Sequence, residues 1–235
     1  MKKNQEYNYR HMSTGRYSLA FDRFDGPKIG ELAPDFTAYT LEDKTVRLSD
    51  YLGKTVILET GSITCPATIG NTKSMQDLMA QYKEMVFLLL YVREAHPGQN
   101  IPAHDSLENK IHCAQRLKKE ENENRIIVVD NLEGDAHKAY GLLPDMVYVI
   151  SKKGYVIYRA QWNNSDRLDE VLHSIHKGKT IQFKESYEFP SAESAGFRVL
   201  KRAGSRAIID MFLTAPRLLL MRLRLKIKNY FKRNK

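Results

Sequence analysis

The two cysteines of this chain lie in different sequence contexts. Cys65 follows the apolar run TVILET in the segment GSITCP and precedes a helical pattern, and Pro66 suits a first helical position. A cysteine at this position faces unpaired N–H groups and the positive end of the helix dipole, which favour the thiolate. We therefore expect Cys65 to be a reactive nucleophile, with the hydroxyl groups of Ser62 and Thr64 as hydrogen-bond donors to the sulfur. The alternative is a small, buried and inert core residue.

Two titratable residues follow the next apolar run, in the segment YVREAHP. Glu94 and His96 flank Ala95 in a predicted loop. A histidine titrates near neutral pH, and a carboxylate can orient it for proton transfer. We expect Glu94 and His96 to form such a pair, and the alternative is that His96 is a solvated loop residue. Cys113 lies in the helical pattern KIHCAQRLKK, where it is predicted to fill the core.

Alternating strands and helices position these residues. Three apolar runs, TVILET, MVFLLLYV and RIIVVD, predict buried strands, and helical patterns over residues 68–84 and 106–121 separate them. Two short strands are expected before the first run, over 33–40 and 44–51, and a hairpin and a last helix over 165–177 follow the third. This order predicts an α/β domain with a central mixed sheet flanked by helices.

Composition divides the chain into unequal parts. The hydrophobic content of 42% is enough for a packed core, whereas the net charge of +9 lies wholly in the tail after residue 197. No signal peptide and no apolar stretch of about 18 residues is present, so we expect a cytoplasmic protein. The predicted parts are a flexible leader (1–28), a domain (29–179), a linker (180–197) and a basic tail (198–235).

The basic tail is predicted to hold one or two helices, divided at Pro216. Its cationic and apolar residues favour peripheral binding to an anionic membrane surface, on the inner face. Nucleic acid is the less favoured partner, because phosphate contacts do not need the leucines of residues 218–220. A solvated tail is the third alternative, and a homodimer is left open.

The order of elements resembles the thioredoxin fold, with Cys65 at a helix start and Pro144 just before the hairpin. In that fold a cis-proline faces the cysteine, but the isomer of the Leu143–Pro144 bond cannot be read from sequence. Thr68 stands three residues after Cys65, so the chain lacks the C-x-x-C motif of disulfide exchangers. The peroxiredoxin motif is matched only in part.

Three segments together, GSITCP, YVREAHP and IPAHDSLENK, resemble the iodothyronine deiodinase family over residues 33–175. The resemblance implies that Cys65 occupies the place of the family's selenocysteine nucleophile, with Ser62 and Thr64 as polar neighbours. It implies that Glu94 and His96 belong to the site. It also implies that His104 binds substrate or delivers a proton; the alternative is a helix-flanking residue before the Ser106 cap.

Three functions remain open from the sequence. The first is a deiodinase-like thiol oxidoreductase, which would act on an aromatic or halogenated phenol with an external thiol reductant and no bound cofactor or metal. The second is a one-cysteine peroxidase, in which peroxide oxidises Cys65 to a sulfenic acid. The third is a non-catalytic binding module held to a membrane or partner by its basic tail.

Overall fold

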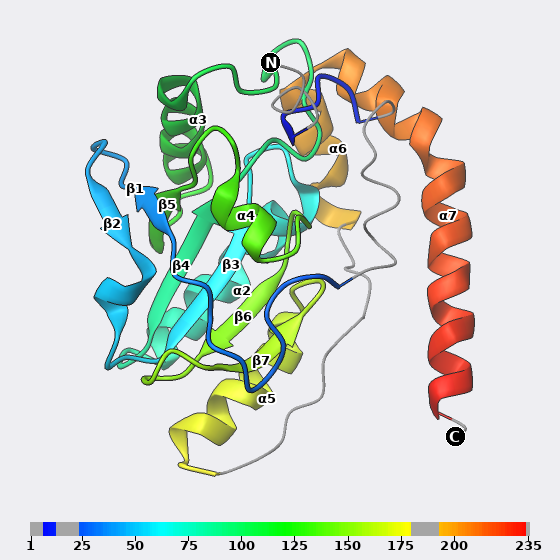
Figure 1. The fold of residues 1–235 in the computed structure, drawn as a ribbon. Coiled ribbons are helices and arrows are strands. Elements are labelled where there is room, and N and C mark those ends of the chain that lie inside the picture. The colour runs from blue at the N-terminus through cyan, green and yellow to red at the C-terminus, as the bar shows by residue number, and fades with distance from the viewer. Residues whose placement is uncertain (1–6, 13–23, 180–192, 234–235) are drawn as a thin grey trace.

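A twisted mixed sheet forms the centre of the domain (Figure 1). The computed structural model describes residues 7–12, 24–179 and 193–233, and within these residues the sheet has seven strands in the order β2-β1-β5-β4-β3-β6-β7. The strands are β1 (Thr37–Tyr39), β2 (Thr45–Arg47), β3 (Val56–Gly61), β4 (Val86–Tyr91), β5 (Ile126–Val129), β6 (Val147–Ile150) and β7 (Val156–Ala160). The predicted central mixed sheet is therefore confirmed.

Strands β3 and β4 lie side by side in the middle of the sheet. They pair in parallel, with Gly61 opposite Tyr91, and every residue of both strands is buried. Because parallel neighbours end at the same edge of a sheet, the loops that follow them start next to each other. This pairing brings the segment that carries Cys65 beside the segment that carries Glu94 and His96.

Helices lie on both faces of the sheet (Figure 1). They are η2 (Leu48–Tyr51), α2 (Pro66–Gln81), α3 (Leu107–Glu120), α4 (Asp135–Ala139), α5 (Ser165–His176), α6 (Glu193–Ala203) and α7 (Ser205–Arg233). Helix α3 begins as predicted, since the Ser106 hydroxyl accepts a hydrogen bond from the Asn109 amide. Alternate strand residues face opposite layers: Leu88 packs in the cluster with α4, and Leu89 packs in the cluster with α3.

The predicted flexible leader is packed against the domain where the structure describes it. Tyr7 and Tyr9 are buried, and the Tyr9 hydroxyl donates a hydrogen bond to the carbonyl of Ala95 at 2.8 Å. Further along, a Cβ at Gly26 would lie 2.6 Å from the hydroxyl oxygen of Tyr148. The prediction is therefore wrong for residues 7–12 and 24–28, and the rest of it lies outside the described residues.

The predicted linker and tail are also corrected. Helix α6 begins at Glu193, so the stretch predicted as a linker over 180–197 is helical from residue 193, and residues 180–192 lie outside the described part. The break between α6 and α7 falls at Gly204, which has a φ of +113°, a conformation that glycine adopts without steric cost. Pro216 does not divide the tail but lies inside α7.

Among the described helices, none has the length and apolar character that crossing a bilayer would require.

Candidate active site

Cys65 is the N-cap residue of α2 and is almost fully buried, with 2% of its surface exposed. Its side chain makes no capping hydrogen bond to the helix, although the backbone amides of Ala67 and Thr68 and the Thr68 hydroxyl act to lower the pKa of the thiol. The structure thus places Cys65 at the predicted junction of a strand and a helix. The predicted donors Ser62 and Thr64 are instead engaged by the neighbouring loop, as described below.

Burial raises the pKa of the Cys65 thiol to about 12, and the negative charge of Asp145 adds to this effect. The polar groups of Thr68 and Ala67 act to lower the pKa but do not outweigh the loss of water around the sulfur. The prediction of a thiolate is therefore wrong for the conformation described, in which Cys65 carries its proton at neutral pH. A base must take up that proton when the sulfur reacts.

The Glu94 cluster, which we define as Thr64, Tyr91, Glu94 and His104, is joined to Cys65 through Thr64, the preceding residue in the sequence. The Glu94 carboxylate accepts hydrogen bonds from the Thr64 amide at 3.2 Å, from the Thr64 hydroxyl and from the Tyr91 hydroxyl. Its Oε1 lies 3.0 Å from Nε2 of His104. The histidine that pairs with Glu94 is thus His104, and not the predicted neighbour His96.

The pKa of Glu94 is lowered even though the side chain is buried. Burial alone would raise it, but the hydrogen bond and charge of His104, together with the hydroxyl groups of Thr64 and Tyr91, stabilise the ionised form more strongly. The Glu94 cluster therefore holds a carboxylate at neutral pH. Tyr91 was not identified from the sequence, although it ends the buried strand three residues before Glu94.

Two backbone hydrogen bonds join the loop after β4 to the loop after β3. The amide of Ala95 donates to the Ser62 hydroxyl oxygen at 3.2 Å, and the amide of His96 donates to the Thr64 hydroxyl oxygen at 3.1 Å. Ser62 and Thr64 therefore position Ala95 and His96, the two residues that follow Glu94. This role requires side-chain oxygens at both positions, and it links Cys65 to the Glu94 cluster through the adjacent Thr64.

The imidazole of His96 is buried, and its Nδ1 has no hydrogen-bond partner in the described part of the chain. Burial lowers the pKa of His96 to about 4, against the opposing charges of Glu94 and Asp210. The ring is therefore neutral at neutral pH and has a free nitrogen for a ligand or a proton. Tyr9 lies in the same cluster of buried residues as Cys65 and Ala95. It was not identified from the sequence, because the residues around it show no periodic pattern.

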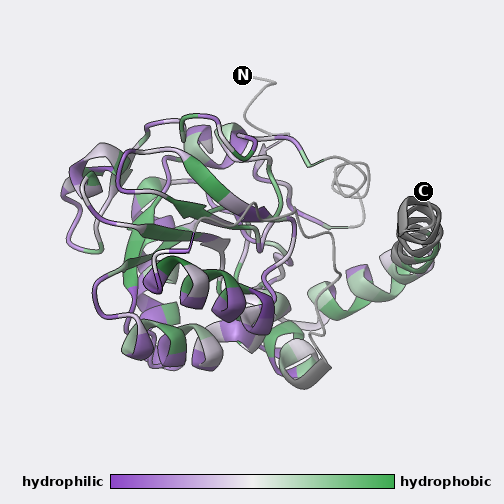
Figure 2. Cartoon of the chain, turned by 90° about the horizontal axis from the view of Figure 1, so that it is seen from below, coloured by the Kyte–Doolittle hydropathy of each residue, from purple (hydrophilic) through white to green (hydrophobic). Residues whose placement is uncertain are grey.

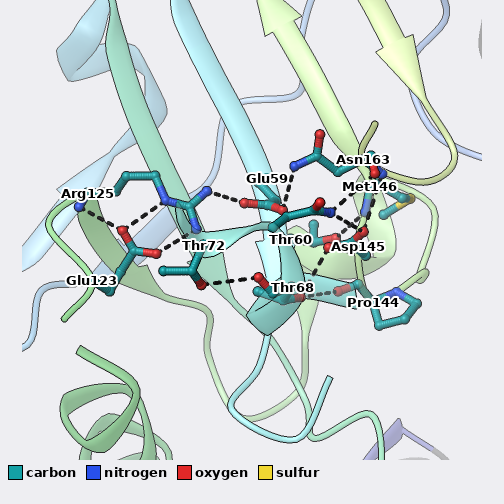
Figure 3. Close-up of polar contacts among 11 residues, drawn as sticks. Glu59, Thr60, Thr68, Thr72, Glu123, Arg125, Pro144, Asp145, Met146 and Asn163 are labelled. Atoms are coloured by element: carbon teal, nitrogen blue, oxygen red, sulfur yellow. Dashed lines mark hydrogen bonds and ion pairs between the residues drawn. The ribbon is translucent and has the colours of Figure 1, made fainter. Parts of the chain in front are cut away.

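A second set of buried polar residues lies on the other side of the α2 start (Figure 3). The Thr68 hydroxyl donates to the carbonyl of Pro144 at 3.3 Å and to Oδ1 of Asp145 at 3.2 Å. Pro144 therefore faces the first turn of α2, as the resemblance to the thioredoxin fold implied. The Leu143–Pro144 bond is trans, since the described residues contain no cis peptide bond.

The Asp145 cluster, which we define as Glu59, Thr68, Asp145 and Asn163, joins this residue to the centre of the sheet (Figure 3). Asn163 donates its backbone amide to Asp145 at 3.3 Å and its side-chain amide to Glu59 at 2.8 Å. Burial raises the pKa of Asp145 well above its ordinary range, and the charge of Glu59 raises it further. The neutral form of Asp145 is therefore favoured beside Glu59.

Arg125 balances the charge of Glu59 inside the protein (Figure 3). Its guanidinium contacts Glu59 on one side and Glu123 on the other, and all three side chains are fully buried. None of these residues was identified as functional from the sequence. The available signal was an acid, Glu59, inside the apolar run TVILET, because a buried charge requires a partner.

One group of residues has donor types and spacing that suit a metal ion. The ligand atoms of Glu94, His104 and Cys113 all lie within 4.8 Å of one another, and zinc sites use these donor types. Glu94 and His104 already contact each other at 3.0 Å, so a metal would have to separate them. The expectation that the chain uses no bound cofactor or metal stays a prediction.

Comparison with known protein families gives a match over most of the chain. The model of the iodothyronine deiodinase family matches residues 4–178. The thyroxine 5-deiodinase of Gallus gallus is 28% identical over 190 residues, which cover 75% of this chain and 73% of that protein. The thyroxine 5-deiodinase of Sparus aurata is 25% identical over 181 residues, covering 72% of this chain and 67% of that protein.

Solved structures similar to this chain share its fold at low sequence identity. The thioredoxin domain of a thiol-disulfide oxidoreductase from Bacteroides vulgatus has a TM-score of 0.50 and 14% identity, over 65% of this chain and 99% of that domain. An uncharacterized conserved protein from Geobacillus kaustophilus has a TM-score of 0.56 and 16% identity, over 70% and 89% of the two chains. The predicted thioredoxin-like fold is confirmed.

Proposed function

Because this chain belongs to the iodothyronine deiodinase family, we propose that it removes iodine reductively from an iodothyronine-type phenol, with Cys65 as the nucleophile. As a member of that family the chain is an enzyme of the oxidoreductase class. The observation that supports this role for Cys65 is its position at the start of α2, one residue from Thr64, whose hydroxyl is bonded to Glu94.

The proposed reaction is balanced in atoms and electrons with a thiol as the reductant. The sulfur of Cys65 attacks the iodine of the aryl iodide, the carbon–iodine bond breaks, and the ring carbon takes a proton. The first products are the deiodinated phenol and a sulfenyl iodide on Cys65. An external thiol then attacks this sulfur and releases iodide, and a second thiol reduces the mixed disulfide, so that two thiols leave as one disulfide.

The protonated state of Cys65 fits this reaction, because the ring carbon needs one proton for each turnover. The thiol can supply that proton in net terms, provided that nearby groups carry it from the sulfur to the carbon. His96 is neutral and has a free nitrogen, so it is suited to accept the thiol proton. The pair of His104 and Glu94 is suited to bind the substrate or to donate a proton.

Iodide release from thyroxine in the presence of dithiothreitol tests the proposal. The Cys65→Ser variant should lose the activity by about a thousandfold or more, since an alcohol is not a soft nucleophile for iodine. The control is Ser174→Ala, which removes a hydroxyl of α5 away from the site and should keep the activity. Circular dichroism of both variants checks that the fold is intact.

Three results would contradict the proposal. If the folded Cys65→Ser variant releases iodide at the rate of the original chain, Cys65 is not the nucleophile. If the chain releases no iodide but consumes hydrogen peroxide in a Cys65-dependent reaction, it is a peroxidase, the second function considered above. A folded chain with neither activity would also contradict the proposal and would favour the third function, a binding role.

A further inference from the structure

Helix α7 exposes a row of large apolar side chains along the part of it whose side chains are described. Figure 1 shows this helix at the side of the domain, and Figure 2 shows hydrophobic residues along its first half. The exposed fractions are high for such residues: Ile209 49%, Phe212 74%, Leu213 61%, Leu219 64%, Leu220 61% and Leu223 56%. A contiguous apolar surface of this kind marks an interaction site.

These side chains share one face of the helix. At about 100° per residue, positions 209, 212, 213, 216, 219, 220 and 223 fall within an arc of about 120°. The buried residues Ala207, Asp210 and Thr214 fall on the opposite side. One side of the helix therefore packs against the rest of the protein, and no described residue covers its opposite, apolar side.

The charge of the same helix is strongly positive. Residues 217–233 contain seven lysines and arginines and no aspartate or glutamate. A helix that combines an apolar face with many cations is typical of segments that lie in the interface of an anionic bilayer. The apolar face enters the headgroup region, and the cations contact lipid phosphates and carboxylates.

The start of α7 is fixed to the loop that follows the candidate active site. The Gln99 side chain accepts a hydrogen bond from the Arg206 amide at 2.9 Å and donates one to the Ser205 hydroxyl at 2.8 Å. The Asn100 amide donates to the carbonyl of Ala203 at 3.0 Å. These contacts hold the helix in a defined orientation relative to the loop that carries Glu94 and His96.

We propose that the outer face of α7 is a docking surface for an anionic lipid bilayer, on which the helix lies parallel to the surface. The apolar arc of positions 209–223 provides insertion, and the cations of residues 217–233 provide charge complementarity. Because Gln99 contacts the start of α7 and Asn100 contacts the end of α6 just before it, binding by α7 also sets the orientation of the domain relative to the bilayer.

Charge separates this occupant from the two alternatives. A second copy packed on the same face would bring two cationic helices together. Residues 217–233 contain no acid in either copy, so the positive charges would repel one another. Nucleic acid would use the cations but would leave Phe212, Leu213 and Leu220 exposed to water. Of these three occupants, only an anionic bilayer uses both the cations and the apolar face.

Co-sedimentation of the full chain with lipid vesicles tests the proposal, and it needs no substrate, so it is independent of the proposed function. Vesicles of phosphatidylserine and phosphatidylcholine should bind the chain at least about tenfold more tightly than vesicles of phosphatidylcholine alone. Added salt should weaken the binding. The triple variant Phe212→Ser, Leu213→Ser, Leu220→Ser should lower binding about tenfold or more.

The matched control replaces three exposed apolar residues elsewhere, Leu32→Ser, Leu52→Ser and Tyr155→Ser, and it should bind as the original chain does. Equal binding of the α7 variant and the original chain would overturn the proposal. So would a dimer seen by sedimentation equilibrium without lipid and abolished by the α7 variant. Binding to a DNA duplex with no binding to anionic vesicles would overturn it in favour of nucleic acid.

Discussion

The Glu94 cluster and the Asp145 cluster are equally buried and lie on either side of the segment that carries Cys65, yet they hold opposite charge states. The pKa of Glu94 is lowered, and the pKa of Asp145 is raised well above its ordinary range. Depth in the protein therefore does not decide whether an acid is ionised. The partners of each carboxyl group decide it.

The partners differ in kind. Glu94 accepts hydrogen bonds from two hydroxyl groups and one amide, and it pairs with His104. Asp145 has hydrogen-bond donors as well, but its neighbour Glu59 is another carboxylate. The one cation in contact with Glu59 in the described residues is Arg125, which Glu123 shares. Two carboxyl groups that share a site with little positive charge retain a proton between them.

Pairs of acids with diverging pKa values are typical of sites that perform acid–base chemistry. In this chain the pair surrounds a thiol that is itself protonated. The comparison therefore assigns the fixed negative charge to Glu94 and a stored proton to Asp145, and the four predictions below test this assignment.

The largest effect is expected for Glu94→Gln. The variant keeps the shape of the side chain but removes the charge that pairs with His104, and iodide release should fall about 100-fold to 10,000-fold. The lowered pKa of Glu94 means that its stabilising contribution is present above the ordinary value of 4.5 and is lost as pH falls through its folded value. The stability difference from the original chain should therefore shrink in acid, as urea unfolding would measure.

The matched control for this variant is Asp77→Asn, which changes an exposed acid on α2 that pairs with Lys73. Its stability should stay within about 0.5 kcal/mol of the original chain, and its activity should be unchanged. A Glu94→Gln variant with full activity would remove Glu94 from the proposed chemistry.

The second-largest effect is expected at Arg125, the cation that contacts Glu59 of the Asp145 cluster. Replacing Arg125 by Met leaves Glu59 and Glu123 buried without their shared partner, and the free energy of unfolding should fall by about 3 to 5 kcal/mol. Urea unfolding measures the loss. Arg47→Met is the control, because its ion pair with Asp35 is exposed and worth about 1 kcal/mol or less. Equal losses in the two variants would show that Arg125 does not balance buried charge.

The third prediction concerns the neutral state of His96. Its folded pKa of about 4 lies below the ordinary value of 6.5, so the unfolded chain takes up this proton first and stability is lost as pH falls from 6.5 toward 4. The loss should reach about 3 kcal/mol, and His96→Gln should abolish that part of the pH dependence. The exposed residue His112 provides the control, since His112→Gln should leave the pH profile of unfolding unchanged.

The smallest effect is expected for Asp145→Asn, which replaces a protonated acid by a neutral amide of the same shape. The folded pKa of Asp145 lies above 3.8, so the unfolded chain ionises first and this group lowers stability as pH rises above 3.8, until the folded value is reached. At neutral pH the variant should therefore be as stable as the original chain or about 1 kcal/mol more stable.

A second measurement on Asp145→Asn sharpens the comparison. A protonated Asp145 has no charge for the variant to remove, so the pH profile of Cys65 alkylation should not move around neutral pH. A shift toward lower pH would show that the charge of Asp145 contributes to the raised pKa of Cys65 there, against the assignment. A loss of more than about 3 kcal/mol in stability would also show that Asp145 is ionised in the folded chain.

Local sequence patterns were sufficient for most of the fold and for the identity of the central residue. The apolar runs that became β3, β4 and β5 and the cap at Ser106 are local features, so each could be located along the chain. The leader could not be predicted, because Tyr7 and Tyr9 have no period. They are ordered by contacts with His137 and Ala95, more than 80 positions away.

The sequence by itself determined that Cys65 lies where a buried strand meets a helix, because the spacing of apolar residues that predicts each element is a local pattern. It also placed Glu94, His96 and His104 in the loop and helix start that follow the next strand. The tertiary structure alone decided which histidine pairs with Glu94, which acid keeps a proton and that the Cys65 thiol is neutral. These outcomes depend on burial and on partners from distant strands, and the free energy of a buried charge is set by those surroundings rather than by its sequence neighbours.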